Sequence, residues 1–310
     1  MRQNAKLKKR AMNEHTPRRN PGNYKPKRVP DAFKVYALGT TNANKGETGM
    51  ERIQSPIDHV VESVFIHVSD LRRSAEWYSM VMGLPLLQER LNGGNVYWLM
   101  LQGGTGIILD DNRSNAPDTP RVRFMYKTSD IEGAYRFLDK QGIRPLYPIE
   151  RPHPGLAFFK FTDPDGNSLM VTQSDYVSDV VERLDQTDSP ILNRIGGIFL
   201  NVTDMNRAIR FHSEVLGLPY REVGPGPENS IYDIRMKSGT GVLLDDNRYR
   251  QGDDYETLFM LVTPDVDSSR AYLEANGVPV FTDIERHGEL AFFTVKDPDG
   301  NVIMICSEAE

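Results

Sequence analysis

The chain has 310 residues, of which 39% are hydrophobic and 26% charged, and its formal net charge is −6. At roughly 100 to 200 residues per domain, this length predicts about two domains. No apolar stretch reaches the ~20 residues of a membrane-spanning helix, and no apolar segment follows the basic amino terminus as in a secretory signal. The single cysteine, Cys306, excludes an intramolecular disulfide and a thiolate-rich zinc site. We therefore expect a cytoplasmic protein with no membrane partner.

The amino-terminal segment differs from the rest in charge. Residues 1–55 carry 13 Lys and Arg against 4 Asp and Glu, which leaves a net charge of −15 on the remaining residues. Its low content of large apolar side chains predicts a disordered basic tail. Such a tail could make the chain an interaction scaffold. It lacks an aromatic stacking series and a regular amphipathic face, so we expect no nucleic-acid partner.

The first structured unit opens with a β-rich run at 64–68 and an amphipathic helix. Asp70 is a typical N-cap, apolar residues follow at a 4, 3, 4 spacing that includes Tyr78, and Gly83 is a typical left-handed end. The order β-α-β-β-β then occurs a second time within the unit. The other predicted elements are strands at 85–89, 95–101, 106–110, 122–126, 144–147, 157–162 and 168–172, and a helix over 130–140.

The second half of the chain repeats the first at an offset of 134 to 135 residues. The run Asp-Pro-Asp-Gly-Asn at 163–167 returns at 297–301, and it suits a tight turn between the last two strands of each unit. His212 replaces Tyr78 on the apolar helix stripe, so we expect it in the core. The predicted organisation is a tail at 1–55, a first domain at 56–173, a linker at 174–193 and a second domain at 194–310.

The paired β-α-β-β-β modules, the entry pattern Val-Ser-Asp-Leu…Trp-Tyr…Met-Gly-Leu-Pro and the closing Asp-Pro-Asp-Gly-Asn resemble the vicinal oxygen chelate superfamily. This group contains glyoxalases, bleomycin resistance proteins and extradiol dioxygenases. The resemblance covers residues 57–173 and 191–307. It implies an α+β fold, a tandem duplication of a glyoxalase-like domain in which two βαβββ modules form a half-open barrel. Because the family hosts several activities, the fold alone does not decide the function.

In that family the concave face of the barrel holds a divalent metal through His, Gln or Glu side chains. Neither unit has a conventional ligand for such a hard cation at the corresponding positions. The resemblance therefore implies barrels without the family's metal, and we expect no cofactor. The positions are Ser63, Ile108, Arg123 and Met170 in the first unit, and Gly197, Leu243, Leu258 and Met304 in the second.

The resemblance also implies which side chains face each pocket. Alternation along the first strand places Ser63, Phe65 and His67 on the cavity side. His67 is either an acid or base that titrates near neutrality or a half-buried structural histidine. Arg123 either binds a ligand carboxylate or pairs with Asp110. The first pocket is the more polar of the two. The predicted ligand-binding residues are Ser63, Phe65, His67, Tyr97, Asp110, Arg123, Met170 and Thr172 in the first unit, and Asn201, Tyr232 and Asp245 in the second.

These observations predict a protein that binds a small amphipathic or aromatic molecule in a metal-free concave pocket, with the first domain favoured. One alternative is a metal-dependent glyoxalase-like isomerase or an extradiol ring-cleaving dioxygenase, which would need a divalent metal. A second alternative is the scaffold that uses the basic tail. The residues do not decide whether the chain is an enzyme. A monomer with two pseudo-symmetric domains and a homodimer both fit the duplication.

Overall fold

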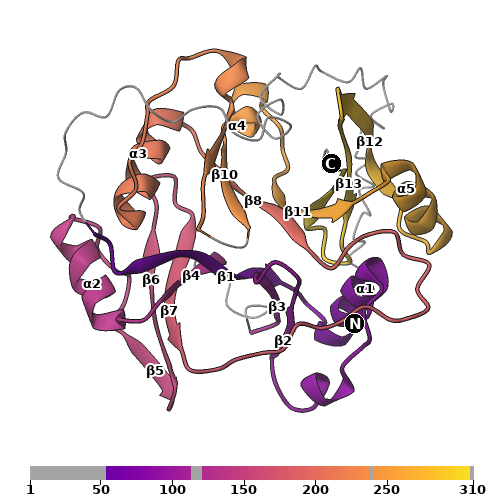
Figure 1. Cartoon of the computed structure of the whole chain (residues 1–310), viewed down its shortest axis with the longest axis horizontal. Helices are drawn as coiled ribbons and strands as arrows, with labels where there is room; N and C mark the ends of the chain where they lie inside the picture. Colours follow the sequence, from indigo (N-terminus) through magenta and orange to yellow (C-terminus); the bar gives the residue numbers. More distant parts are fainter. Residues whose placement is uncertain (1–53, 113–120, 238–239, 308–310) are drawn as a thin grey trace, which may run out of the picture.

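The structure is a computed structural model that describes residues 54–112, 121–237 and 240–307. It contains two units of seven strands each, which follow one another along the chain (Figure 1). The predicted disorder of the basic tail concerns residues that lie outside the described ranges, apart from its last two. Within those ranges, none of the helices is long and apolar enough to cross a membrane.

The first unit consists of one seven-stranded sheet and two α-helices. Its sheet order is β2-β3-β1-β4-β7-β6-β5. The elements are β1 (Ile57–His67), α1 (Leu71–Met82), the 3-10 helix η2 (Gln88–Leu91), β2 (Val96–Met100), β3 (Gly106–Asp110), β4 (Val122–Thr128), α2 (Ile131–Lys140), β5 (Glu150–His153), β6 (Leu156–Thr162) and β7 (Ser168–Ser174).

The second unit repeats this topology, with sheet order β12-β13-β14-β11-β8-β10-β9. The tandem duplication and the α+β class are thus confirmed. The elements are β8 (Ile195–Asn201), α3 (Met205–Leu216), η3 (Pro227–Asn229), β9 (Ile231–Ile234), β10 (Gly241–Asp245), α4 (Asn247–Gln251), β11 (Thr257–Thr263), α5 (Val266–Ala275), β12 (Val280–His287), β13 (Leu290–Lys296) and β14 (Val302–Ser307).

Two predicted strands of the first unit are wrong. Residues 85–89 run into η2 instead, and the Leu87 amide donates to the hydroxyl of Tyr97 rather than to a neighbouring strand. Residues 144–147 are not a strand either, because Pro145 and Pro148 cannot donate to a sheet ladder. The edge strand forms later, at β5.

The first helix begins and ends where its sequence predicts. The Asp70 side chain accepts from the Arg73 amide at 3.0 Å, and Gly83 adopts the left-handed conformation with φ 65°. Asp204 and Gly217 do the same for α3. These caps fix where each helix leaves its first strand, and so they fix the position of Tyr78 and His212 on the helices.

Alternation along β1 separates two faces of the first sheet. Val64 and Ile66 are buried in the hydrophobic core, whereas Phe65 and His67 on the opposite face are half-buried. β1 pairs in parallel with β3 and antiparallel with β4. The residue alternation expected for the cavity-facing strand is therefore present.

The two units share one hydrophobic core, because a single cluster of buried side chains contains residues of both. In Figure 1, α3 lies over the first sheet and α1 lies next to α5 of the second unit. The Tyr272 hydroxyl of α5 donates to the Met80 carbonyl of α1 at 2.9 Å, and the Ser55 hydroxyl donates to the Val215 carbonyl of α3 at 2.7 Å. The units therefore pack as one body.

Candidate functional site

The Asp-Pro-Asp-Gly-Asn runs form tight turns, as predicted. Asp163 Oδ1 accepts from the amides of Asp165 and Asn167 at 2.9 and 2.8 Å, and Gly166 has φ 85°. A side-chain carboxylate that accepts from the amides two and four residues later holds the turn closed. The second unit's turn has the same hydrogen bonds from its own residues.

Each turn contacts the first helix of the other unit. Asp299 Oδ1 accepts from the Ser69 amide and from Arg73 Nη2, both at 3.1 Å. At the equivalent position of the other turn, Asp165 Oδ1 accepts from the Thr203 amide at 2.9 Å and from Arg207 Nη2 at 2.6 Å. The units are thus joined by two reciprocal contacts related by a pseudo-twofold axis.

The first Asp of each turn reaches a buried helix residue of the other unit. The Tyr78 hydroxyl donates to Asp297 Oδ2 at 2.9 Å, and His212 Nε2 lies 3.3 Å from Asp163 Oδ2. Burial raises the pKa of Asp297, against hydrogen bonds from Asn301 and Tyr78. Burial alone would raise the pKa of Asp163, but hydrogen bonding and charge from His212 and a hydrogen bond from Asn167 lower it. His212 is in the core as expected.

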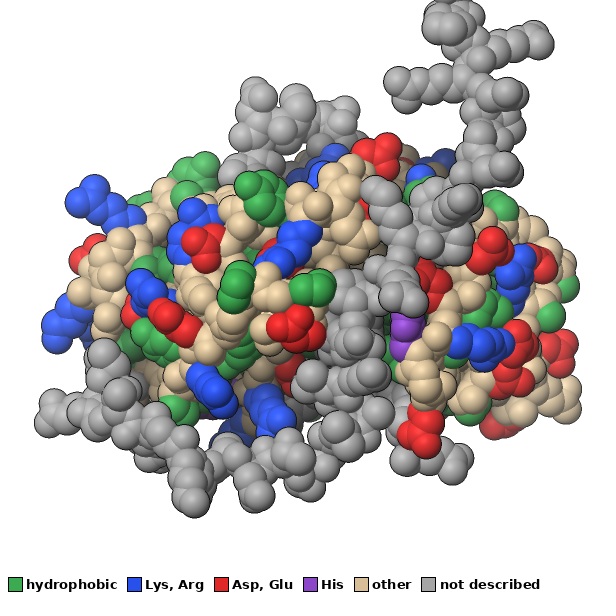
Figure 2. Space-filling model, turned by 90° about the horizontal axis from the view of Figure 1, so that it is seen from above, with side chains coloured by type: hydrophobic (Ala, Val, Ile, Leu, Met, Phe, Trp, Pro, Cys, Tyr) green, Lys and Arg blue, Asp and Glu red, His purple; other side chains and the backbone are tan. Residues whose placement is uncertain are grey.

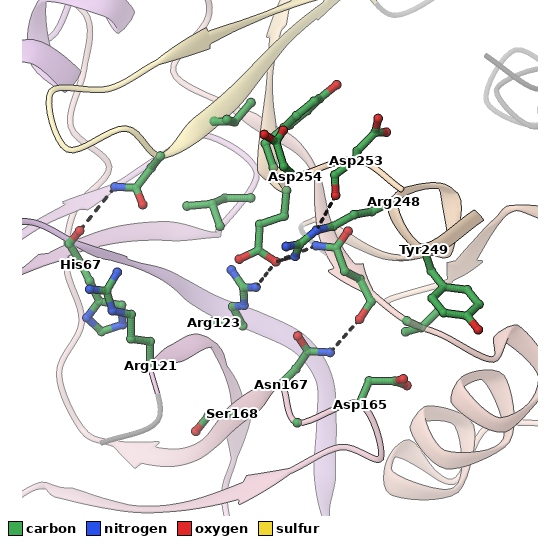
Figure 3. Close-up of a pocket in the computed structure, with 18 of the residues that line it drawn as sticks. His67, Arg121, Arg123, Asp165, Asn167, Ser168, Arg248, Tyr249, Asp253 and Asp254 are labelled. Carbon is green, nitrogen blue, oxygen red and sulfur yellow. Dashed lines mark hydrogen bonds and ion pairs between the residues drawn. The ribbon is translucent and has the colours of Figure 1, made fainter. Parts of the chain in front are cut away.

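A cleft of about 980 Å³ lies between these two turns, where corresponding ends of the two sheets meet (Figure 3). The first unit supplies the end of β1 and the starts of β4 and β7; the second supplies the end of β8 and the starts of β11 and β14. The lining includes apolar and charged side chains of both units. Among them are Phe65, His67, Arg121, Val122, Arg123 and Asp165 of the first unit and Asn201, Arg248, Tyr249, Asp253, Asp254, Glu256, Leu258 and Lys296 of the second.

Three donors converge on one carboxylate oxygen in this cleft. Glu256 Oε2 lies 2.5 Å from Arg123 Nη2 and 3.1 Å from Arg248 Nη1, and it accepts from Asn201 Nδ2 at 2.9 Å. Arg123 belongs to the first unit and the other donors to the second. Figure 3 shows the two arginines pointing toward each other. Arg123 therefore pairs with an acid of the other unit, not with Asp110 as one sequence hypothesis had it.

His67 is held within the first unit. Its Nε2 lies 3.1 Å from the Val122 carbonyl oxygen, so this nitrogen carries a proton and donates. Nδ1 lies 3.9 Å from Asp110 Oδ2, and the ring stacks on Phe65 at 6.4 Å. The ring thus lines the cleft with one nitrogen already engaged, which favours the structural hypothesis for His67 over proton transfer through Nε2.

The remaining predicted residues lie away from the cleft lining. Tyr97 is fully buried in the shared core, and Tyr232 packs against the same core. Asp110 and Asp245 accept from the amides of Asn112 and Asn247, each at 2.8 Å, so both close turns. Burial raises the pKa of Asp245 to about 6. Ser63, Met170 and Thr172 are buried on the same face of the first sheet as Phe65, because Ser63 is in register with Met125 and Met125 with Met170.

The second sheet's concave face is filled by its own side chains. A separate apolar cluster consists of Phe199, Leu243, Met260, Leu290, Phe292, Met304 and Cys306, all at most 6% exposed. A Cβ placed on Gly197 would lie 2.7 Å from Leu243 Cδ1 and 2.8 Å from Met260 Cε. In the first unit, Phe65, Ile108, Met125 and Phe158 keep partial exposure at matching positions. The predicted inequality of the two barrels therefore has a packing basis.

The residues at the family's metal positions do not fit a divalent cation. In the second barrel, Leu243 and Met304 occupy those positions within the apolar cluster. In the first, Arg123 is a cation paired with Glu256, and Met170 offers a soft, weak sulfur donor. Within the described ranges, no group of three or more His, Cys, Asp or Glu side chains could hold a metal ion.

Sequence reasoning missed Glu256, Arg248 and Arg121 as cleft residues. Arg121 and Glu256 directly precede the fourth strand of their units, β4 and β11, at the same 135-residue offset as the repeat. That position was a readable signal once Arg123 was proposed to face a cavity. What the sequence did not show is that the two units present these strand ends to each other.

Known proteins resemble this chain in fold. The family model Glyoxalase/Bleomycin resistance protein/Dioxygenase superfamily matches residues 56–171 and 192–305. The Mn(II)-bound glyoxalase from Novosphingobium aromaticivorans aligns with TM-score 0.53 and 16% identity, covering 82% of this chain and 83% of that one. Homoprotocatechuate 2,3-dioxygenase from Arthrobacter globiformis gives 0.54 and 17%, covering 83% and 82%.

A catechol 2,3-dioxygenase structure gives TM-score 0.52 and 14% identity, covering 81% of this chain and 89% of that one. No curated protein matches the sequence. The structural likenesses, all below 25% identity, show the fold. Because the family model matches most of the chain in two copies, as the two seven-stranded units would require, the chain belongs to the Glyoxalase/Bleomycin resistance protein/Dioxygenase superfamily.

Proposed function

We propose that this protein binds a small amphipathic or aromatic molecule, without a metal, in the cleft between its two units. The observation that carries the proposal is the cleft itself, about 980 Å³ and lined by both units. Its size lies in the range of small-molecule sites, which combine apolar walls with a few placed polar groups. Phe65 and Leu258 supply apolar surface, and Arg123 and Asn201 supply polar groups.

The chemistry of the residues supports binding without a Lewis acid. The side chains at the family's metal positions are apolar, small or cationic, and the second barrel is filled by its own apolar cluster. Of the first unit's partly exposed concave residues, Phe65 lines the cleft. The first domain is therefore the favoured side of the site, as the sequence also predicts.

The test is a thermal-shift screen of aromatic and amphipathic compounds against the full chain, before and after treatment with EDTA, together with metal analysis. We expect hits whose shifts survive EDTA. Leu258→Trp, which places a larger ring at the cleft wall, should weaken those hits by about tenfold or more. Tyr176→Trp is the matched control, because Tyr176 is exposed and lies outside the cleft lining.

Two results would contradict the proposal. One is a stoichiometric bound transition metal whose removal abolishes binding. The other is a set of hits that Leu258→Trp and Tyr176→Trp affect equally, because those ligands would then bind elsewhere on the chain.

A further inference from the structure

The centre of the cleft is built as a carboxylate site, and it is occupied by a side chain of the protein. Arg123, Arg248 and Asn201 all bind one oxygen, Glu256 Oε2. Arginine pairs and an amide are the donors that recognise carboxylates, and hydrogen bonds to ionised groups are about twice as strong as neutral ones. The donors come from both units, so the arrangement exists only where the units meet.

Charge within this cluster does not balance. One carboxylate faces two guanidinium groups, which leaves an excess positive charge at the cleft wall. Arg121, at the position of the first unit that corresponds to Glu256, adds another cation to the lining, and no ion pair of Arg121 is found among the described residues. Over the whole lining, Arg121, Arg123, Arg248 and Lys296 balance Asp165, Asp253, Asp254 and Glu256, so the positive excess is local to the two guanidinium groups at Glu256. A monoanionic group that replaces Glu256 meets both of these guanidinium groups.

The position of Glu256 allows its side chain to move away from the three donors. It precedes β11 and belongs to no helix or strand, and its side chain is 30% exposed toward the cleft. A glutamate side chain at such a position can rotate into solvent, while the donors stay fixed on β4, on α4 and at the end of β8. An incoming carboxylate would then take over the same hydrogen bonds.

We propose that the ligand of this cleft carries a carboxylate, which binds Arg123, Arg248 and Asn201 by displacing Glu256. Glu256 is thus a specificity-determining residue: its carboxylate competes with the ligand and rejects molecules that cannot replace it. This inference rests on the proposed function, because it names the ligand class for the same cleft. The exchange is non-covalent and conserves charge in the site.

The experiment compares benzoate with benzamide, its neutral analogue, by calorimetry on the full chain. Glu256→Ala removes the internal competitor and should strengthen benzoate binding by about tenfold, while benzamide changes less than twofold. Asp254→Ala is the matched control. Asp254 lines the same cleft, but within the described residues it makes no ion pair or hydrogen bond with the three donors. A general gain in positive charge would strengthen benzoate equally in both variants, and that result would overturn the inference.

Two further arms keep the test decisive. In Arg123→Ala/Glu256→Ala the gain should disappear, and a retained gain would overturn the inference. If Glu256→Ala does not fold, Glu256→Gln keeps the size of the internal competitor and removes its charge. It should strengthen benzoate at least threefold and leave benzamide unaltered, and equal effects on both probes would overturn the inference. The proposed function fails separately, if no neutral or charged compound responds to Leu258→Trp.

Discussion

Tyr78 and His212 occupy equivalent helix positions, yet they place different chemistry on a buried carboxylate. Tyrosine donates a neutral hydroxyl to Asp297, and burial dominates there, so the pKa of that acid is raised. Histidine can carry a positive charge beside Asp163, and with Asn167 it outweighs burial and lowers the pKa of that acid. The same contact, present once in each direction between the units, therefore shifts the pKa of its carboxyl group upward in one copy and downward in the other.

His212→Tyr should make the second contact resemble the first. A carboxylate with a lowered pKa in the folded state stabilises the fold above its unfolded pKa, and this contribution is lost as pH falls through the folded value. We expect the variant to reduce the free energy of unfolding by about 1 to 2 kcal/mol at pH 7 and by less near pH 2.5, well below the ordinary pKa of 3.8 for this carboxyl. Urea titrations at both pH values measure it.

Tyr126→Phe is the control for this experiment, because the Tyr126 hydroxyl is buried with no hydrogen-bond partner among the described residues. Its removal should leave stability equal or higher at both pH values. A penalty for His212→Tyr that is larger at pH 2.5 than at pH 7 would show that His212 does not support the ionised form of Asp163.

At the scale of single elements, the two concave faces differ in packing. Leu243 on β10 is 1% exposed within a closed apolar cluster, whereas Ile108 on β3 holds the same position in the first unit and is half-buried. The second sheet therefore uses its concave face as a small core of its own, and the first leaves part of that surface available.

This difference predicts unequal costs for equivalent truncations. Leu243→Ala opens a cavity in a packed cluster and should lower the free energy of unfolding by about 3 kcal/mol. Ile108→Ala removes a side chain that already meets solvent and should cost less than about 1.5 kcal/mol. Chemical denaturation measures both, and equal losses would show that the first concave face is packed as tightly as the second.

The elements with strong local signals could be predicted. Helix α1 is bounded by Asp70 and Gly83, and the turns at Asp163 and Asp297 carry their own capping groups, so the sequence alone determines them. The strand at 85–89 failed, because the tertiary hydrogen bond from the Leu87 amide to Tyr97 replaced a ladder that local composition favoured.

The candidate site was predictable in part. Phe65, His67, Arg123 and Asn201 all line the cleft between the units, whereas the sequence predicted them in two separate barrel pockets. Tyr97 was predicted on the cavity face of its strand but lies on the core face, because its residue type fits either side of a strand. The position of Glu256 could be read from the repeat, but its pairing with Arg123 could not, since that guanidinium comes from the other unit.

For the whole molecule, the shared core implies that the units unfold together. Both tryptophans, Trp77 and Trp98, lie in the first unit, so tryptophan fluorescence reports that unit alone. We expect Leu243→Ala, a change in the second unit, to shift the fluorescence transition and the far-ultraviolet circular dichroism transition by the same amount. A fluorescence midpoint that stays at the wild-type value would show that the units unfold independently.

The face of the molecule in Figure 2 carries charges of both signs. Figure 2 shows acidic and basic side chains interspersed over the described part of the face in view. Charge is also used between the units, where Arg73 pairs with Asp299 and Arg207 with Asp165.

These exchanged turns have a consequence for symmetry. In a two-fold homodimer, residue i of one copy contacts residue j of the other, and j contacts i in return. The pairs Arg73 with Asp299 and Arg207 with Asp165 have that form, although they lie within one polypeptide. Two separate copies of one unit would need only this self-complementary contact to form a dimer, and the tandem chain contains it within one polypeptide. Because both halves lie in one chain, matching positions need not be identical: Arg121 and Glu256 hold the same place in the two units and carry opposite charges.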